Sequence, residues 1–352
     1  EVGIRPWSRG LSYDEETHFQ ALHYLRNRSR SVGGHERPLF LCVSYHHPHD
    51  PFHVTREMWD ACTDAEVTIP DLSGNTRYPE SVMDRWLNLG YHRTDLHDIS
   101  APQSLMALRR SYSALVTYID TKVGELLKVL EEQELLENSM IIFTSDHGDM
   151  LGERGMVQKR CFYEWSSRIP LLVRMPGGSP ERQRILEPVS LLDITPTLLQ
   201  VLCGSAEGEQ LAADMDGRSF LDLIDDQGNE AGGSADGTRE VFAEYVGEGV
   251  LGHCAMLVGN GFKYIRVHGH DEQLFNLQDD PCELHNLAAQ ENCQAVRQAM
   301  AALVGQRFNA DDIEMKVQES ITGRAVVRDA MQISRTSWDY APEYDTETQY
   351  HR

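Results

Sequence analysis

The sequence predicts an α/β domain followed by a smaller C-terminal α+β domain with an antiparallel sheet. Short apolar runs alternate with helix-like segments in the first 205 residues, an order typical of parallel strands. After residue 238 the pattern changes to short strands that follow one another closely. With 352 residues, 41% of them hydrophobic, the chain can bury the core of one large domain with an appendage, or of two domains.

Two helices are predicted in the N-terminal half. Ser12 and Glu15 are spaced as a capping box, and Phe19, Leu22 and Leu25 follow at helical spacing. The stretch 53–100 is polar and has no clear period, which predicts a long surface excursion. The strongest helical pattern comes next, with apolar residues at steps of three and four: Leu108, Tyr112, Leu115, Ile119, Val123, Leu126 and Leu130.

Three apolar runs predict the strands of the α/β sheet. The run 39–44 ends in "YHHPHDPF", and the run 141–143 ends in "SDHGDMLGERG". The third, within "IPLLVRMPGG", is ended by proline and glycine. The segment "LLDITPTLLQVLCG" then predicts a helix with Asp193 as N-cap, Pro196 in the first turn and Gly204 as the stop.

The C-terminal part reads as antiparallel strands and helices. "REVFAEYV", "HCAMLVGNGF" and "KYIRV" are the predicted strands, and Asn260-Gly261 is a hairpin signal between the last two. Helices are expected near 289–307 and 311–332. Because the run 225–239 is acidic and rich in glycine, we predict domains at 1–205 and 239–352 joined by a connection at 206–238.

Charge and cysteine usage narrow the function classes. A net charge of −23 argues against nucleic acid or an anionic membrane as partner, and no apolar run approaches membrane-spanning length. Seven irregularly spaced cysteines without a C-x-x-C pair predict reduced thiols in a cytoplasmic protein. The chain starts without Met, a signal-peptide pattern or an opening strand, so we expect it to continue upstream.

Two strand ends carry an unusual density of polar residues. Ligands of open α/β sheets bind at the carboxyl ends of strands. Asp146, His147 and Asp149 follow one run, His46, His47 and His49 follow another, and Lys159 comes shortly afterwards. Aspartate offers hard oxygen to a divalent cation, imidazole can ligate or carry a proton, and lysine can bind an oxyanion. The structural alternative is a helix N-cap at Asp146 or Asp149 with solvated histidines.

The segment "TSDHGDMLGERG" and the lysine after it resemble the sulfatase family of alkaline-phosphatase-like hydrolases. The resemblance implies that Asp146 and His147 bind a calcium ion and that Lys159 contacts the sulfate. "SYHHPHDPF" resembles the family segment whose histidine lies beside the leaving-group oxygen. His47 is the predicted catalytic residue there, with His46 as the alternative.

The resemblance extends along nearly the whole chain and implies an alkaline-phosphatase-like mixed sheet flanked by helices. The late segment "DEQLFNLQDDPCELHNLA" has the family's D-P-x-E-x-x-N-L core. "HPHDPF" and "SWDY" most resemble choline-sulfatase-like members. That similarity implies a small-molecule sulfate ester as substrate and a homo-oligomer. It also implies substrate contacts from Glu244, His49 and Trp338, because a quaternary ammonium group needs an aromatic or carboxylate cage.

One departure from the family is the nucleophile. Sulfatases carry C-x-P-S-R or S-x-P-x-R, whose Cys or Ser becomes formylglycine, and neither pattern occurs here. We therefore expect the formylglycine upstream of this chain, with His47 as general acid for the leaving alcohol. The alternatives are a phosphonate monoester or phosphodiester hydrolase of the same superfamily, and a non-catalytic fragment that lacks the nucleophile.

Overall fold

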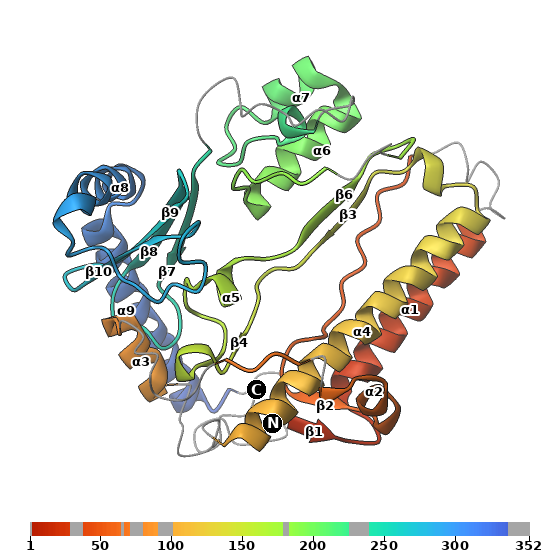
Figure 1. Ribbon diagram of the computed structural model, residues 1–352, viewed down its shortest axis with the longest axis horizontal. Helices are drawn as coiled ribbons and strands as arrows, with labels where there is room; N and C mark the ends of the chain where they lie inside the picture. Colours follow the sequence, from red (N-terminus) through yellow and green to blue (C-terminus); the bar gives the residue numbers. More distant parts are fainter. Residues whose placement is uncertain are drawn as a thin grey trace.

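The computed structural model describes residues 2–28, 38–64, 67–70, 80–90, 101–178, 183–224 and 239–336. Figure 1 shows two long helices side by side at one edge, a two-stranded ribbon across the middle, and a four-stranded sheet with its helices at the opposite edge. The elements up to residue 178 are β1 (Val2–Ile4), α1 (Arg9–Arg28), β2 (Phe52–Val54), α2 (Arg56–Ala61), α3 (Val82–Gly90), α4 (Pro102–Glu132), β3 (Ile141–Thr144), β4 (Met150–Leu151), β5 (Val157–Gln158), α5 (Glu164–Ser167) and β6 (Leu171–Arg174). Those after it are α6 (Ile194–Cys203), α7 (Ser205–Leu211), β7 (Val241–Tyr245), β8 (Cys254–Gly259), β9 (Phe262–Val267), β10 (Glu272–Asn276), α8 (Gln294–Arg307) and α9 (Ala310–Ser334).

Helix α1 begins before the predicted capping box. It starts at Arg9, and the Ser8 hydroxyl accepts a hydrogen bond from the Leu11 N–H (3.2 Å). Of the three apolar residues whose spacing predicted the helix, Leu25 is buried, Leu22 is partly buried and Phe19 is 59% exposed. The positions that are buried recur at steps of three and four, and two of them are polar. They are Leu11, Asp14, His18, Ala21 and Leu25.

Helix α4 confirms the strongest periodic pattern of the sequence. Pro102 occupies the first turn, where a missing N–H costs no helical hydrogen bond. Leu105 packs in one cluster with Phe52 of β2. Further along the helix, Ile119 packs in another cluster with Leu11 of α1. The helix therefore joins the N-terminal strands and α1 into one packed unit.

The paired strands of the first half are not all parallel, which corrects the prediction from strand–helix alternation. β1 and β2 do pair in parallel, with Gly3 opposite His53. β3 and β6 pair antiparallel, with Ile142 opposite Val173. The connection between them, residues 145–170, consists of turns, the β4–β5 hairpin and the four-residue α5. Because no long crossover helix returns the chain to the start of β3, the two strands meet in opposite directions.

The apolar run 39–44 does not form the predicted strand. Among the described residues no segment pairs with its backbone, and Phe40 is 74% exposed. An apolar run becomes a strand only where a neighbour takes its backbone hydrogen bonds. The segment nevertheless runs between β3 and the α1–α4 pair and leads to the histidines that follow it (Figure 1).

The polar stretch 53–100 contains more regular structure than its composition predicted. Helix α2 starts at a Thr55 cap, whose hydroxyl accepts the Met58 N–H at 3.3 Å. Helix α3 packs Val82, Met83 and Leu87 into a cluster with the C-terminal sheet. The positions 65–66, 71–79 and 91–100 lie outside the described residues.

Helix α6 matches its prediction except for the role of Asp193. Gly204 ends the helix with φ +84°, a backbone conformation that favours glycine. The Asp193 carboxylate does not cap α6. It accepts hydrogen bonds from the Ser190 N–H (2.9 Å) and the Arg218 N–H (2.7 Å), and so ties the start of α6 to the chain beyond α7.

The C-terminal sheet has the strand order β10-β9-β8-β7 and is antiparallel throughout, as predicted. Asn260 and Gly261 turn between β8 and β9 with φ of +52° and +76°. Side chains alternate along β8, so Met256 faces the cluster with α3 whereas Leu257 faces α8. The fourth strand, β10, was not predicted.

Helices α8 and α9 lie close to the two predicted C-terminal helices. No helix in the described ranges is long and apolar enough to cross a membrane. Residues 225–238 of the predicted connection lie outside the described residues, so the division into domains stays a prediction.

Candidate active site

The turn after β3 requires a glycine between the two candidate metal ligands and Asp149. The Gly148 N–H donates to the Ser166 carbonyl at 2.8 Å, and a Cβ at Gly148 would lie 2.2 Å from the Trp165 carbonyl oxygen. Only glycine allows this approach. The turn leaves the Asp146 side chain 84% exposed and His147 partly buried. Strand β4 follows, not a helix, so the alternative of a helix N-cap at these residues is wrong.

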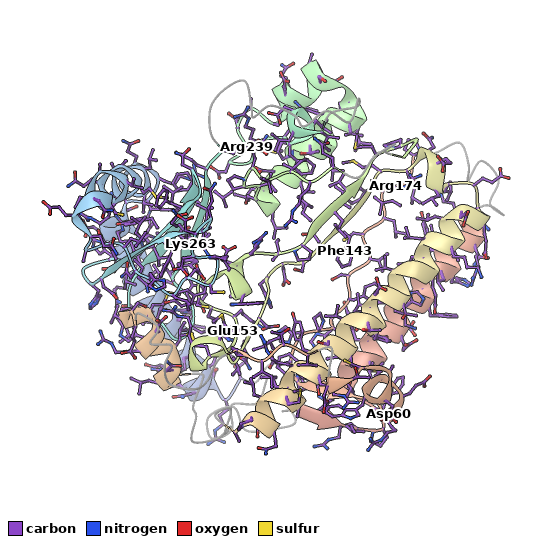
Figure 2. The ribbon with its side chains drawn as sticks, viewed as in Figure 1. Asp60, Phe143, Glu153, Arg174, Arg239 and Lys263 are labelled. Atoms are coloured by element: carbon purple, nitrogen blue, oxygen red, sulfur yellow. The ribbon has the colours of Figure 1, made fainter. Side chains whose placement is uncertain are left out.

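The β4–β5 hairpin carries the chain from this turn to Lys159. Gly152, at φ +106°, opens the turn, and its N–H donates to the Met156 carbonyl at 2.8 Å. Glu153, labelled in Figure 2, holds the hairpin against α4. Its carboxylate forms a buried ion pair with Arg109 of that helix and accepts the Leu151 N–H at 2.7 Å. The direction in which residues 158–160 leave the hairpin is thereby fixed.

Residues 46–50, here called the histidine loop, are anchored to α1. Asp14 Oδ2 lies 2.5 Å from His47 Nδ1, and Asp14 Oδ1 accepts the His46 N–H at 2.6 Å. The His46 ring centroid is 5.5 Å from that of His47 and 4.9 Å from that of His49. Burial, followed by the charges of His49 and His47, lowers the pKa of His46.

Lys159 reaches the histidine loop from the other side. Its Nζ contacts His49 Nε2 and lies 3.8 Å from Asp50 Oδ1. Burial lowers the pKa of Lys159, although the carboxylates of Asp50 and Asp149 oppose the shift. The His49 ring is also 6.0 Å from the His147 ring, centroid to centroid. Histidines from the loop, the lysine and the turn after β3 therefore form one cluster, as the sequence predicted.

Two buried carboxylate oxygens in this cluster have no hydrogen-bond partner among the described residues. They are Asp50 Oδ1, which makes only ion-pair contacts, and Asp149 Oδ1. Burial raises the pKa of Asp149 to about 7, with Lys159 opposing the shift and Asp50 adding to it. A buried carboxylate oxygen without a partner is costly, so its retention at Asp149 indicates a place that receives a cation or a donor.

The donors of this chain fit part of a calcium site. Asp146 and Asp149 offer the hard oxygen atoms that calcium prefers. Burial lowers the pKa of His147, which favours the neutral imidazole that ligates metals. In the described ranges, however, no group of three or more His, Cys, Asp or Glu side chains is placed to hold an ion. Asp146 and His147 are thus a partial set of ligands.

Of the two predicted substrate contacts in the C-terminal part, the structure describes only Glu244, and its contacts lie outside the cluster. Glu244 Oε2 lies 3.3 Å from the Nε2 of buried His253. Its neighbour Tyr245 donates to the Glu248 carbonyl, and Glu248 pairs with Arg160 next to Lys159. Adjacent residues of a strand face opposite sides, so Tyr245 rather than Glu244 is on the side of the cluster. Trp338 lies outside the described residues.

Sequence reasoning missed Asp14 as a member of the site. The available signal was its position three residues after Leu11 and four before His18, on the buried face of α1. It also passed over Gln158, whose side-chain amide donates to Asp50 Oδ2 at 3.2 Å. Nothing in the sequence distinguishes that glutamine from a solvated one.

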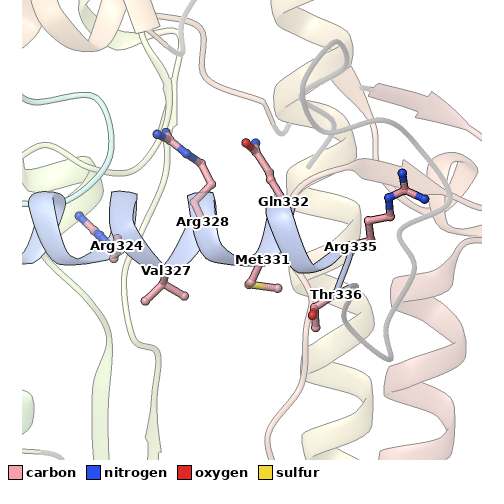
Figure 3. Close-up of a pocket in the computed structure, with 7 residues that line it drawn as sticks. All are labelled: Arg324, Val327, Arg328, Met331, Gln332, Arg335 and Thr336. Atoms are coloured by element: carbon pink, nitrogen blue, oxygen red, sulfur yellow. The ribbon is translucent and has the colours of Figure 1, made fainter.

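A separate pocket lies along the end of α9 (Figure 3). No carboxylate or imidazole lines it, so it lacks the candidate metal ligands and proton donors of the histidine cluster. Its lining consists of Arg324, Val327, Arg328, Met331, Gln332, Arg335 and Thr336.

Two family models match the sequence. Residues 6–205 match the family described as "Sulfatase". The chain belongs to the sulfatase family. Residues 152–309 also match "N-sulphoglucosamine sulphohydrolase, C-terminal", a region that includes Lys159 and the C-terminal sheet.

Two curated sulfatases show the extent of the similarity. The sequence is 32% identical over 361 residues to the choline-sulfatase of Rhizobium meliloti (strain 1021), covering 100% of this chain and 67% of that protein. It is 29% identical over 292 residues to arylsulfatase K of Xenopus laevis, covering 78% of this chain and 53% of that protein. The sulfatase chain described here thus spans between about half and two thirds of the length of these relatives.

The fold is also that of solved members of the superfamily. The phosphonate monoester hydrolase from Silicibacter pomeroyi matches with a TM-score of 0.65 and 20% identity, covering 83% of this chain and 59% of that one. At this identity the match establishes the fold alone. It agrees with the predicted mixed α/β architecture of the sulfatase family.

Proposed function

We propose that this sulfatase-family chain forms the sulfate-binding and leaving-group side of the active site of a choline-sulfatase-like sulfuric ester hydrolase. The observation that carries the proposal is the cluster in which Lys159 meets His49 and the buried carboxylate of Asp50. A half-buried lysine beside histidines and buried carboxylates suits a site that receives an anion together with a cation. The 32% identity to a choline-sulfatase gives the proposed subfamily.

In the proposed reaction Lys159 binds the non-bridging oxygens of the sulfate ester and offsets their charge. His47 donates a proton to the leaving-group oxygen as the bond between sulfur and that oxygen breaks. The electron pair of the broken bond stays on the leaving oxygen, and the transferred proton neutralises it. The oxygen nucleophile that attacks sulfur is proposed to be the formylglycine of the family, outside the residues of this chain.

Asp146 and His147 would hold the divalent metal, proposed to be calcium, together with ligands from elsewhere in the protein. The metal would supply a Lewis acid for the sulfate oxygens. The exposed Asp146 carboxylate remains available for such a ligand role, since the hydrogen bond and ion pair that it makes among the described residues are both with the adjacent His147. The cytoplasmic location and the homo-oligomer remain predictions from sequence. All seven cysteines lie in the described ranges, and no disulfide joins any two of them.

Initial rates of the full-length protein on three substrates test the proposal. Choline sulfate, para-nitrophenyl sulfate and a phenyl phosphonate monoester are compared before and after treatment with a chelator. We expect turnover of both sulfate esters, a preference for choline sulfate, and loss of activity on chelation that added Ca²⁺ restores. A preference for the phosphonate would indicate the related phosphonate hydrolase activity, and no turnover of any ester would indicate a non-catalytic protein.

A further inference from the structure

Both carboxylate oxygens of Asp14 accept hydrogen bonds from the histidine loop. Asp14 is 0% exposed and lies in the second turn of α1. Oδ1 accepts the His46 N–H at 2.6 Å, while Oδ2 accepts the His47 N–H at 3.1 Å and lies 2.5 Å from His47 Nδ1. Three donors from two consecutive residues thus bind one buried carboxylate. These hydrogen bonds offset the free-energy cost of removing the carboxylate from water.

This arrangement distinguishes the two adjacent histidines. A carboxylate only accepts hydrogen bonds, so the Nδ1 of His47 carries a proton and its Nε2 is the nitrogen left for other chemistry. Among the described residues Nε2 has no hydrogen-bond partner, although the His47 side chain is only 1% exposed. Asp14 takes only the backbone N–H of His46, whose ring contacts other histidines instead.

Two further contacts restrict the His47 ring. Tyr118 of α4 packs against it edge-on, with ring centroids 6.0 Å apart and planes at 86°. On the α1 side the chain has Gly10, where a Cβ would lie 2.7 Å from His47 Cε1, 2.9 Å from His47 Nε2 and 2.8 Å from His46 Cδ2. Glycine at this helical position therefore leaves the space that the ring occupies, beside the nitrogen that has no partner.

We infer that Asp14 is a positioning residue that orients His47, and not His46, with Nε2 available to the leaving group. The inference rests on the proposed function, in which His47 is the general acid. A carboxylate on Nδ1 fixes the orientation of the ring and directs Nε2, the nitrogen that donates the proton, toward the leaving group. The proton then moves from Nε2 to the leaving oxygen as the S–O bond breaks, and neutral His47 remains paired with Asp14.

The test is the dependence of the rate on the leaving group in the full-length protein carrying Asp14→Asn. Choline sulfate leaves as an alkoxide and needs protonation, whereas para-nitrophenyl sulfate leaves as a stabilised phenolate and does not. We expect kcat/KM to fall at least about 100-fold for choline sulfate but less than about 10-fold for the aryl ester. Glu15→Gln, on the next residue of α1, is the matched control and should leave the ratio of the two rates unchanged. Glu15 contacts Tyr118 and Lys122 instead of the loop.

Gly10→Ala gives a second variant that does not touch the carboxylate. Alanine favours the helix, but its methyl group displaces the His47 ring and also the adjacent His46 ring. The same selective loss on choline sulfate is expected, which keeps the inference testable where Asp14→Asn does not fold. Equal losses on both esters in the folded variants, or no loss, would overturn it.

A spectroscopic measurement separates the inference from the proposed function. In protein labelled with ¹⁵N-histidine, the proton on His47 Nδ1 should give a downfield, slowly exchanging signal that Asp14→Asn abolishes and Glu15→Gln retains. If the signal is present but no sulfate ester is hydrolysed, the proposed function fails while the Asp14–His47 pairing stands. Absence of the signal in the wild-type protein would contradict the pairing itself.

Discussion

Two lysines, Lys263 and Lys159, are withdrawn from solvent, and their surroundings differ. Lys263 of β9, labelled in Figure 2, is 0% exposed. Its Nζ lies 2.7 Å from Glu164 Oε1 and 2.8 Å from Glu283 Oε1, and it donates to the Phe162 carbonyl at 2.7 Å. Lys159 is partly buried, and its one ion pair among the described residues is the 3.8 Å contact to Asp50.

The difference in their ion pairs distinguishes a lysine with a structural role from one that can bind a ligand. The ammonium group of Lys263 has a partner for each of its three N–H donors, and these partners connect the sheet to the start of α5 and to the D-P-x-E segment. In that segment Glu283 also accepts the Glu164 N–H at 2.9 Å. No position remains for a ligand. Lys159 carries a charge that its neighbours leave incompletely compensated, which is the condition for binding an external anion. Mutations that distinguish the two environments follow, from the largest expected effect on stability to the smallest.

Lys263→Met should cause the largest loss of stability. It leaves Glu283 and Glu164 buried without their cation, and breaking a buried pair in this way typically costs about 3–5 kcal/mol. Urea denaturation of the full-length protein measures the change. Lys128→Met, at an exposed position of α4, is the control and should leave the midpoint unchanged. A loss below about 1 kcal/mol for Lys263→Met would contradict its structural role.

Gly148→Ala should come next. Its Cβ would meet the backbone at Trp165 and Ser166, which cannot move as a flexible side chain would. We expect a loss of about 1–3 kcal/mol from overpacking, together with loss of activity because Asp146 and His147 shift with the turn. Gly124→Ala is the matched control in α4, where a Cβ meets nothing within 4 Å and the helix gains from alanine. Similar unfolding midpoints for the two variants would disprove the close approach.

Lys159→Met should change the unfolding free energy by less than about 1 kcal/mol, because its contact to Asp50 is long, at 3.8 Å, and Asp50 keeps its contacts with His49 and Gln158. Burial lowers the pKa of this lysine, so the folded protein disfavours its charged form. Turnover of sulfate esters should be lost. Thermal and urea unfolding, measured with the rates, check both halves. A stability loss as large as that of Lys263→Met would remove the distinction between the two sites.

Asp146→Asn should have the smallest effect on stability, within about 0.5 kcal/mol, since the side chain is largely exposed. Metal-dependent turnover in the full-length protein should nevertheless be abolished. Asp60→Asn, an exposed aspartate of α2, provides the comparison and should keep the wild-type rate. Wild-type turnover by the Asp146 variant at low calcium would exclude it as a ligand.

The parts of the fold that depend on local sequence signals could be predicted. The period of α4, the Asn260-Gly261 turn and the glycine stop of α6 depend on neighbouring residues and were correct. The direction of β6 beside β3 and the failure of 39–44 to form a strand depend on distant partners, which periodicity does not reveal.

The site shows the same division. Motif resemblance identified His47, His49, His147 and Lys159, and the structure brings the last three into contact. The choice between His46 and His47 stayed open because the two are adjacent and chemically identical. Asp14 distinguishes them from 33 residues away in sequence, and a single acidic residue in a helix carries no sign of that distant contact.

The most direct test of the anion site is calorimetric titration of inorganic sulfate into the full-length protein in the presence of Ca²⁺. The wild-type protein and Lys128→Met should bind sulfate with the same affinity, and Lys159→Met should bind it at least about 10-fold more weakly while unfolding at the wild-type midpoint. Unchanged sulfate affinity in folded Lys159→Met would contradict the assignment of this lysine, and with it the central claim that the histidine cluster binds the sulfate group.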